Sequence, residues 1–140
     1  MADSEADVSL EVTAATAREL INLDLATLLD VRQPFEREVE GAPEEGIAVP
    51  LFQFKHLLGH RLDPEEQEIL DADVPDDREM RHFMQTINGQ HFGADRILLC
   101  LCNSGRRSLH AAALLRELGF GRSLSVAGGW RAWSVAEDGE

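Results

Sequence analysis

Residues 97–118 read ILLCLCNSGRRSLHAAALLREL, and the order of elements in this segment indicates the class of fold. Its first part, 97–101, is a continuous apolar run with the length of a buried strand. Residues 108–118 are typical of a helix, and Gly119 follows as a helix C-cap. A buried strand that leads through a short loop into a helix is the unit from which parallel sheets are built.

Short strands and helices alternate along the rest of the chain. We expect further strands at 9–12, 26–31 and 123–127, and helices at 14–22, 51–58, from 63, at 76–88 and after 128–129. Residues 32–50 are interpreted as a loop because prolines and glycines interrupt them. The alternation predicts a three-layer α/β domain, in which helices flank both faces of a mostly parallel central sheet. We assign residues 9–136 to this single domain and residues 1–8 to a frayed N-terminus.

Composition and charge narrow the classes of function. The chain has 140 residues, 44% of them apolar, and a net charge of −13 from 26 acidic and 13 basic residues. Such a chain repels phosphates, so nucleic-acid binding through general electrostatics is not expected. No run reaches the roughly 18 apolar residues of a membrane span, and the acidic N-terminus lacks the plan of a signal peptide. We therefore expect a cytoplasmic protein without a membrane partner.

The cysteine and lysine contents are both informative. Cys100 and Cys102 are two residues apart on one strand end, so a disulfide between them would be badly strained. Reduced thiols fit a reducing compartment, and the pattern is not that of a zinc site. Lys55 is the single lysine among many arginines, which suggests, as a hypothesis, adaptation to a salt-rich cytoplasm.

The segment after the strongest strand carries the predicted chemistry. Cys102 falls at the carboxyl end of strand 97–101, where open parallel sheets bind their ligands. The connection Asn103-Ser104-Gly105-Arg106-Arg107 leads into a helix, so its backbone N–H groups form a nest that suits an anion. Nearby guanidinium groups and a helix N-terminus favour a thiolate over a thiol. We therefore expect Cys102 to be a nucleophile.

Three blocks of this sequence resemble the rhodanese sulfurtransferases. The loop CNSGRRS, 102–108, follows their C-x-x-G-x-R-S pattern, and GGWRAW, 128–133, is similar to their closing segment. Upstream, LLDVRQPFE, 28–36, is similar to their other hallmark, with Asp30, Arg32 and Glu36 in place. The resemblance covers roughly residues 9–58 and 95–135 and leaves 59–95 without an assigned role.

The resemblance implies a sulfur shuttle that needs no metal or organic cofactor. Cys102 would take a sulfur from a donor such as thiosulfate or a persulfide, and pass it to a thiophilic acceptor. Backbone N–H groups of 103–107 would hold the persulfide. Arg107 would orient the loop, Arg106 would face the substrate, and Ser108 would cap the helix or bond within the loop.

The residues around the cysteine loop are expected to have structural rather than catalytic roles. Asp30 ends a strand near the site, and Arg32 with Glu36 could form an ion pair that fixes the loop. Cys100 is interpreted as a packed strand residue, with a resolving thiol as the alternative. Trp130 and Trp133 are expected to wedge the last helix against the sheet.

Some departures leave alternatives open. Asn103 stands where the family often has arginine or tyrosine, and the stretch 38–50 lacks the histidine that the family often has there. Phosphatases and arsenate reductases of related fold also use a loop cysteine and arginine, but their loop is one residue longer than this one. A non-catalytic binding module is a third reading, although such domains commonly lack the cysteine. The physiological donor and acceptor, the pathway and the oligomeric state stay open.

Overall fold

A computed structural model defines the fold. It describes residues 10–43, 46–49, 51–57, 59, 61–72, 85, 96–103 and 105–138. The expected frayed segment 1–8 and the expected helix 76–88, apart from residue 85, lie outside the described residues.

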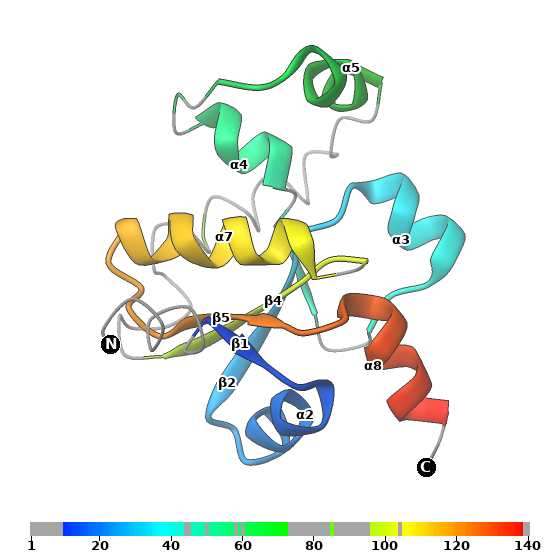
Figure 1. Cartoon of the computed structure of the whole chain (residues 1–140), viewed down its shortest axis with the longest axis vertical. Helices are drawn as coiled ribbons and strands as arrows, with labels where there is room; N and C mark the ends of the chain where they lie inside the picture. Colours follow the sequence, from blue (N-terminus) through cyan, green and yellow to red (C-terminus); the bar gives the residue numbers. More distant parts are fainter. Residues whose placement is uncertain are drawn as a thin grey trace.

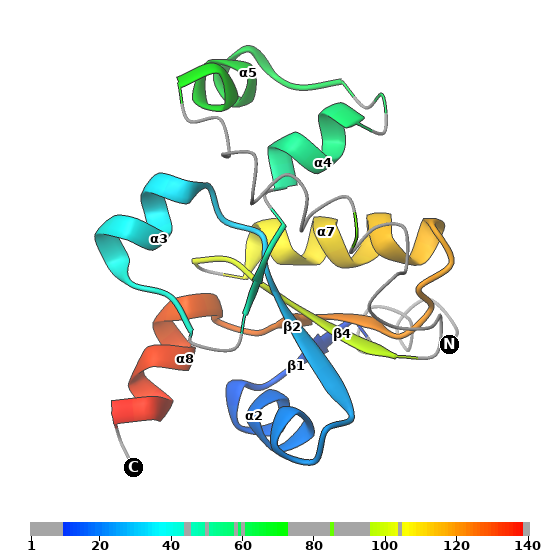
Figure 2. The same cartoon turned by 180° about the vertical axis from the view of Figure 1, so that it is seen from behind.

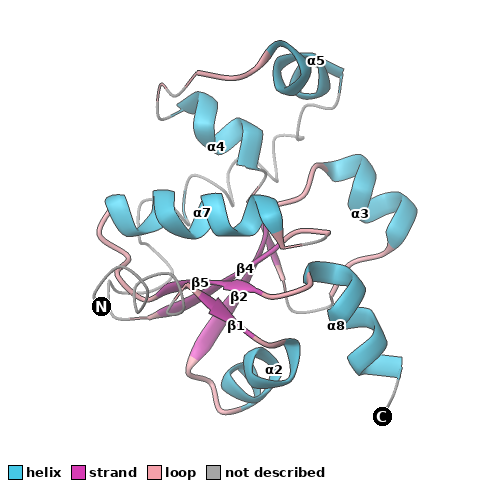
Figure 3. Cartoon of the chain, in the orientation of Figure 1, coloured by secondary structure: helices cyan, strands magenta, loops and turns pink. Residues whose placement is uncertain are grey.

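The described strands form one parallel sheet. In chain order they are β1 (Glu11–Val12), β2 (Ala26–Asp30), β3 (Ile47–Ala48), β4 (Ile97–Leu101) and β5 (Ser123–Val126). Their order in the sheet is β1-β5-β4-β2-β3, and every pairing is parallel. The sheet occupies the middle of Figure 3. The predicted mostly parallel α/β architecture is confirmed.

Helices lie on both sides of this sheet (Figures 1 and 2). One face carries α7 (Arg106–Glu117), with α4 (Leu51–Leu57) and α5 (Pro64–Ala72) stacked beyond it; the other carries α2 (Ala14–Asn22) and α8 (Gly129–Asp138). A further helix, α3 (Pro34–Glu40), lies beside α8 and the start of α7.

The domain has two hydrophobic cores, one on each face of the sheet, and alternate side chains of β4 contribute to each of them. Leu98 and Cys100 point to one face and belong to the core beneath α7. Leu99 and Leu101 point to the other face and pack in a second core that contains Trp133. Each of these residues is fully buried, as a central parallel strand requires.

The ends of two predicted helices have the expected caps. The Thr13 hydroxyl accepts a hydrogen bond from the Thr16 N–H at 3.1 Å and so caps α2. Gly119 adopts φ +105° just past α7, and the Phe120 N–H donates to the Leu115 carbonyl at 3.0 Å. α7 begins at Arg106, two residues before the predicted start at 108, so the arginines of the loop form the first turn of the helix.

The prediction of a loop over 32–50 is wrong, because this stretch contains α3 and β3. Pro34 occupies the first turn of α3, where its missing N–H costs no hydrogen bond. The Glu36 carboxylate accepts from the Gln33 N–H at 2.9 Å and completes a capping box. Gly41 ends the helix at φ +89°.

None of the helices described is both long enough and apolar enough to cross a membrane.

Candidate active site

Cys102 and the Asp30–Arg32 segment meet at the carboxyl edge of the sheet. Asp30, the last residue of β2, stands in register with Leu101, the last residue of β4. Both chains leave the sheet at this point, so Cys102 and Arg32 follow from neighbouring strand ends. This is the position where the sequence predicted the site.

The sulfur of Cys102 is held by the loop that follows it. The Gly105 N–H donates to Sγ at 3.1 Å, and the Ser108 N–H donates to it at 3.4 Å. The Ser108 hydroxyl also lies 3.4 Å from Sγ. Gly105 reaches this geometry at φ +101°, where a Cβ would lie 3.2 Å from the Gly128 nitrogen. Main-chain donors therefore point at Sγ, as in an anion nest.

Burial of the thiol is a difference from the expected site. The sequence placed Cys102 at the carboxyl end of a strand, where ligands bind, but its side chain is fully buried. Burial follows because Sγ turns under the loop and towards the first turn of α7. Among the described residues, N–H donors to Sγ come from Gly105, which lies within the run 103–107 that the resemblance implied, and from Ser108, which lies just beyond it. Ser104 lies outside the described residues.

Ser108 connects the thiol to a second serine on β5. The two hydroxyls of Ser108 and Ser125 lie 2.6 Å apart, and the Ser125 hydroxyl donates to the Gly105 carbonyl at 3.4 Å. Both serines are fully buried. Ser108 therefore bonds within the loop, which was one of its two expected roles, while the N-cap of α7 is Gly105.

Arg107 anchors the loop to α3. Its guanidinium donates to both carboxylate oxygens of Glu36, at 2.7 Å for the Nη1–Oε2 pair. The hydrogen bond to Glu36 raises the pKa of Arg107 despite burial, so the guanidinium is fully charged. Burial alone would raise the pKa of Glu36, but hydrogen bonds from Arg107 and Gln33, with the charges of Arg107 and Arg32, lower it. Arg106 points to solvent and is exposed.

We expect Glu36→Gln to reduce the free energy of unfolding by about 1–2 kcal/mol at pH 7, because a charged, bidentate contact becomes a neutral one. Since the pKa of Glu36 is lowered from 4.5, its stabilisation is present above that pH and is lost as the pH falls below it. Urea unfolding at pH 7 and near pH 3.5 should therefore show a difference between wild type and variant that shrinks in acid. Glu38→Gln, an exposed change on the same helix, is the control. An equal loss in both variants would contradict the role of the pair.

Arg32 is bound to Asp30 and not to Glu36, which corrects the expected ion pair. Its Nε and Nη2 donate to the two oxygens of Asp30 at 2.9 and 2.8 Å, and Nη2 also donates to the Gly41 carbonyl at 2.9 Å. Both charged residues are buried. The guanidinium carbon lies 5.0 Å from the ring centre of Trp130, a cation–π contact.

The first residues of α8 bind the backbone of the cysteine loop. The Trp130 N–H donates to the Cys102 carbonyl at 2.6 Å, and the Arg131 N–H donates to the Asn103 carbonyl at 3.4 Å. Gly129, at φ +60°, makes this approach possible, since a Cβ there would lie 2.2 Å from the Cys102 carbonyl oxygen. The backbone around the nucleophile is thus fixed by a segment far along the chain.

Glu40 links the loop, α3 and α8. Its carboxylate accepts from the side-chain amide of Asn103 at 2.7 Å, and its carbonyl accepts from the Trp130 indole at 3.0 Å. Trp130 therefore belongs to the site, whereas Trp133 is the buried wedge that the sequence predicted. Sequence reasoning missed Glu40 and Ser125 as neighbours of the loop, because no local pattern marks either residue.

Cys100 has the surroundings of a packing residue. It is fully buried in the core beneath α7. Burial, and to a smaller extent the charge of Cys102, raises the pKa of the Cys100 thiol, so it is protonated at neutral pH. A thiol that stays protonated is a poor nucleophile.

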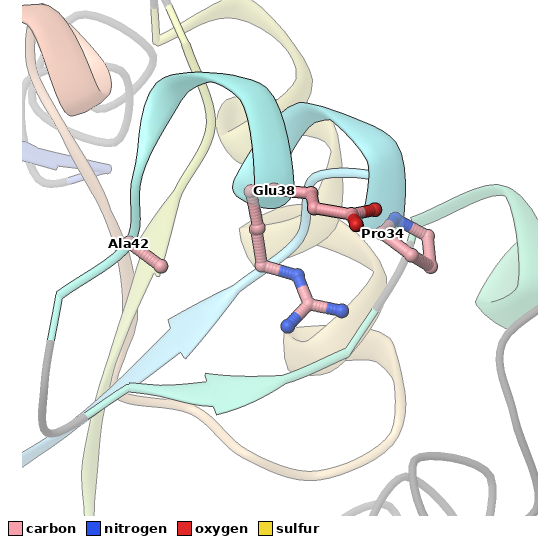
Figure 4. A pocket seen from close by; sticks show the side chains of 4 residues that line it. Pro34, Glu38 and Ala42 are labelled. Carbon is pink, nitrogen blue, oxygen red and sulfur yellow. The ribbon is translucent and has the colours of Figure 1, made fainter.

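An open hollow lies beside α3. It is lined by Pro34, Arg37, Glu38 and Ala42, and Figure 4 shows Pro34 and Glu38 on the helix with Ala42 in the segment after it. In the described part of the chain, the hydrogen bonds of Cys102 are made by residues such as Gly105, Ser108 and Trp130, which do not line this hollow. The hollow is therefore a feature of the surface beside the site.

Fold and site together define a parallel α/β domain with a cysteine loop at the carboxyl edge of its sheet. Residues 13–136 match the family model for the Rhodanese-like domain. The chain belongs to this family, as the three sequence blocks indicated.

Similar proteins include several sulfurtransferases. A protein of Allochromatium vinosum named "Sulfurtransferase" is 34% identical over 67 residues, which are 48% of this chain and 63% of that protein. The human single-domain sulfurtransferase TSTD1 superposes with a TM-score of 0.58 at 24% identity, over 90% of this chain and 96% of that one. The Saccharomyces cerevisiae single-domain sulfurtransferase RDL2 gives 0.57 at 22% identity, over 93% and 92%. These two structures share the fold.

Proposed function

We propose that this protein is a sulfurtransferase that carries sulfur as a persulfide on Cys102. The observation that carries the proposal is the pair of main-chain donors, Gly105 N–H and Ser108 N–H, aimed at the Cys102 sulfur. Such donors stabilise negative charge on sulfur, and the first turn of α7 adds its positive end. The family, and relatives named as sulfurtransferases, support the same reaction class.

The reaction has two displacement steps. With thiosulfate, the Cys102 thiolate attacks the outer sulfur, a bond forms between it and Sγ, the S–S bond of thiosulfate breaks, and sulfite leaves with the electron pair. An acceptor such as cyanide then attacks the outer persulfide sulfur, the new S–S bond breaks, and thiocyanate leaves while the Cys102 thiolate returns. Electrons and atoms balance without a metal or redox cofactor.

Access to the sulfur requires a movement of the loop. Cys102 is fully buried, so a donor reaches Sγ only in a conformation with the loop opened. Two side-chain contacts among the described residues link the loop to α3: Arg107 with Glu36, and Asn103 with Glu40. We therefore expect α3 to control how readily the loop opens.

The test is mass spectrometry of the intact protein after incubation with thiosulfate or cysteine persulfide. We expect a gain of about 32 Da, one sulfur atom, that maps to the peptide containing Cys102 and disappears after cyanide is added. An aryl phosphate should not be hydrolysed. A protein that takes no sulfur from either donor, yet hydrolyses the phosphate ester, would overturn the proposal.

A further inference from the structure

Strand β5 carries two serines on the face that packs against α7. Leu124 and Val126 belong to the core on the opposite face of the sheet. Because side chains alternate along a strand, Ser123 and Ser125 face α7. Both are fully buried, and a buried hydroxyl without a hydrogen-bond partner costs free energy. The partner of each serine therefore indicates what the hydroxyl does.

Ser125 is connected to the nucleophile through Ser108. The two serine hydroxyls lie 2.6 Å apart, and the Ser108 hydroxyl lies 3.4 Å from the Cys102 sulfur. At the other end, the Ser125 hydroxyl lies 3.4 Å from the Gly105 carbonyl oxygen. Two hydroxyls thus form a buried chain that runs from Sγ to the backbone of the cysteine loop.

The direction of this chain depends on the charge of Cys102. Each hydroxyl has one proton, and two oxygens 2.6 Å apart need one proton between them. A Cys102 thiol can donate to Ser108, which donates to Ser125, which donates to the Gly105 carbonyl. A Cys102 thiolate can only accept, so Ser108 donates to Sγ and Ser125 donates to Ser108. The hydroxyls rotate between these two states, and each proton stays on its own oxygen.

The thiolate gains more from the chain than the thiol does. Hydrogen bonds to a charged acceptor are stronger than those between neutral groups. A hydroxyl that itself receives a hydrogen bond is a better donor, so Ser125 strengthens the bond from Ser108 to Sγ. Rotation gives up the long contact with the Gly105 carbonyl, but an N-cap carbonyl normally accepts the first hydrogen bond of its helix.

Building on the proposed function, we propose that Ser125 is a positioning residue, which holds the Ser108 hydroxyl as a donor to Cys102 and so favours the attacking thiolate. It acts through Ser108, from a strand that lies outside the cysteine loop. The Gly105 and Ser108 N–H groups supply fixed donors to Sγ, and the hydroxyl chain adds a donor that adjusts to the charge of the sulfur.

Other ionisable groups around Cys102 stay the same when a serine is replaced. The charge of Cys102 acts on Cys100 in β4 and on Arg107 in α7. Further charged residues in the described part of the chain stand on the elements around the loop: Asp30, Arg32, Glu36, Glu40, Arg106 and Arg131. Differences between serine variants therefore do not come from a change in charge.

The test is the rate at which iodoacetamide alkylates Cys102, measured as a function of pH, with tandem mass spectrometry to distinguish Cys102 from Cys100. Cys102 is buried, so alkylation requires opening of the loop, and the opening sets the plateau rate at high pH. The midpoint of the pH profile reports the fraction of thiolate in the closed form, because that form dominates. A structural loosening therefore changes the plateau, whereas loss of the hydroxyl chain changes the midpoint.

We expect Ser125→Ala to raise the midpoint by about 0.5–1 pH unit, as the weakening of one hydrogen bond to a charged group implies. Below the midpoint, this variant should load sulfur from thiosulfate about threefold to tenfold more slowly than the wild type, and the difference should vanish at high pH. Ser125→Thr keeps the hydroxyl on a residue that suits a strand, so it should retain the wild-type midpoint.

Ser123→Ala is the matched control. Ser123 is a fully buried serine of the same strand, but its hydroxyl donates to the Phe120 carbonyl at 2.9 Å and not to Ser108. This variant also loses a buried hydrogen bond, so its stability should fall, but its midpoint should be that of the wild type.

A second variant pair tests whether Ser125 acts through Ser108. Ser108→Ala removes the donor to Sγ and should raise the midpoint more than Ser125→Ala does. In the Ser108→Ala background, Ser125→Ala should cause no further rise, because the two residues act in one chain.

Two results would overturn the role of Ser125: a wild-type midpoint in Ser125→Ala, or shifts that simply add in the double variant. An equal shift in Ser123→Ala would do so as well. The proposed function fails in a different way. If the midpoints move as expected but no form of the protein takes sulfur from thiosulfate or cysteine persulfide, the sulfurtransferase proposal is wrong and the effect of Ser125 on the thiol stands.

Discussion

Replacing Cys102 with serine is expected to abolish sulfur loading and to reduce transfer to cyanide by about 10³-fold or more, to the uncatalysed background. The loss follows because a hydroxyl cannot form a persulfide, even when the Gly105 and Ser108 N–H groups still point at it. The measurements are the 32 Da mass gain and the rate of thiocyanate formation. Stability should change little, because serine is close in size to cysteine and finds hydrogen-bond partners in the loop.

Cys100→Ser is the control that separates the two thiols. Cys100 is buried beside the site but is protonated, so we expect this variant to load Cys102 and to turn over like the wild type. Its free energy of unfolding should fall by about 1 kcal/mol, since a hydroxyl replaces an apolar thiol in the core. A large loss of transfer in the Cys100 variant with normal loading of Cys102 would instead assign Cys100 the role of a resolving thiol.

Replacing Gly129 with alanine is expected to destabilise the fold by about 3–5 kcal/mol. A Cβ at this position would lie 2.2 Å from the Cys102 carbonyl oxygen and 2.6 Å from the Asn103 carbonyl, so backbone must move on one side or the other. The left-handed φ of +60° adds about 1 kcal/mol for any residue with a side chain. Urea unfolding gives the change in free energy, and sulfur loading reports the state of the loop.

Gly119→Ala isolates the backbone part of that cost. Gly119 also has a positive φ, +105°, but a Cβ there has open space around it. We expect this control to cost about 1–2 kcal/mol and to leave sulfur loading as in the wild type. If Gly129→Ala lowered the free energy of unfolding no more than Gly119→Ala, the close approach of α8 to the loop would not contribute to the cost of this substitution.

The parts of the fold that could be predicted are those in which the local sequence and the core agree. β4 and α7 were predicted because β4 is a continuous apolar run and α7 buries a regular apolar face. α3 was missed because none of its residues is buried, so it has no apolar periodicity. Contacts with distant residues hold this helix in place, above all the pair of Glu36 with Arg107, 71 positions apart.

The nucleophile and its loop could be predicted from the sequence, but the ion-pair partners of the arginines at the site could not. The position of Cys102 follows from the strand before it and the helix after it. The choice of Asp30 as the partner of Arg32, and of Glu36 as the partner of Arg107, depends on how the strand ends meet in space. Nor does the spacing of two tryptophans reveal that Trp133 enters the core while Trp130 lies over Arg32.

The backbone hydrogen bonds between the cysteine loop and α8 limit where this domain can be truncated or permuted. The Cys102 and Asn103 carbonyls are satisfied by Trp130 and Arg131, near the end of the chain. A fragment that stops before Gly129 would keep the whole C-x-x-G-x-R-S signature and still leave those carbonyls without their donors. Truncated or permuted versions should therefore be cut outside residues 129–131, and a signature match alone is poor ground for expecting a working enzyme in a shortened protein.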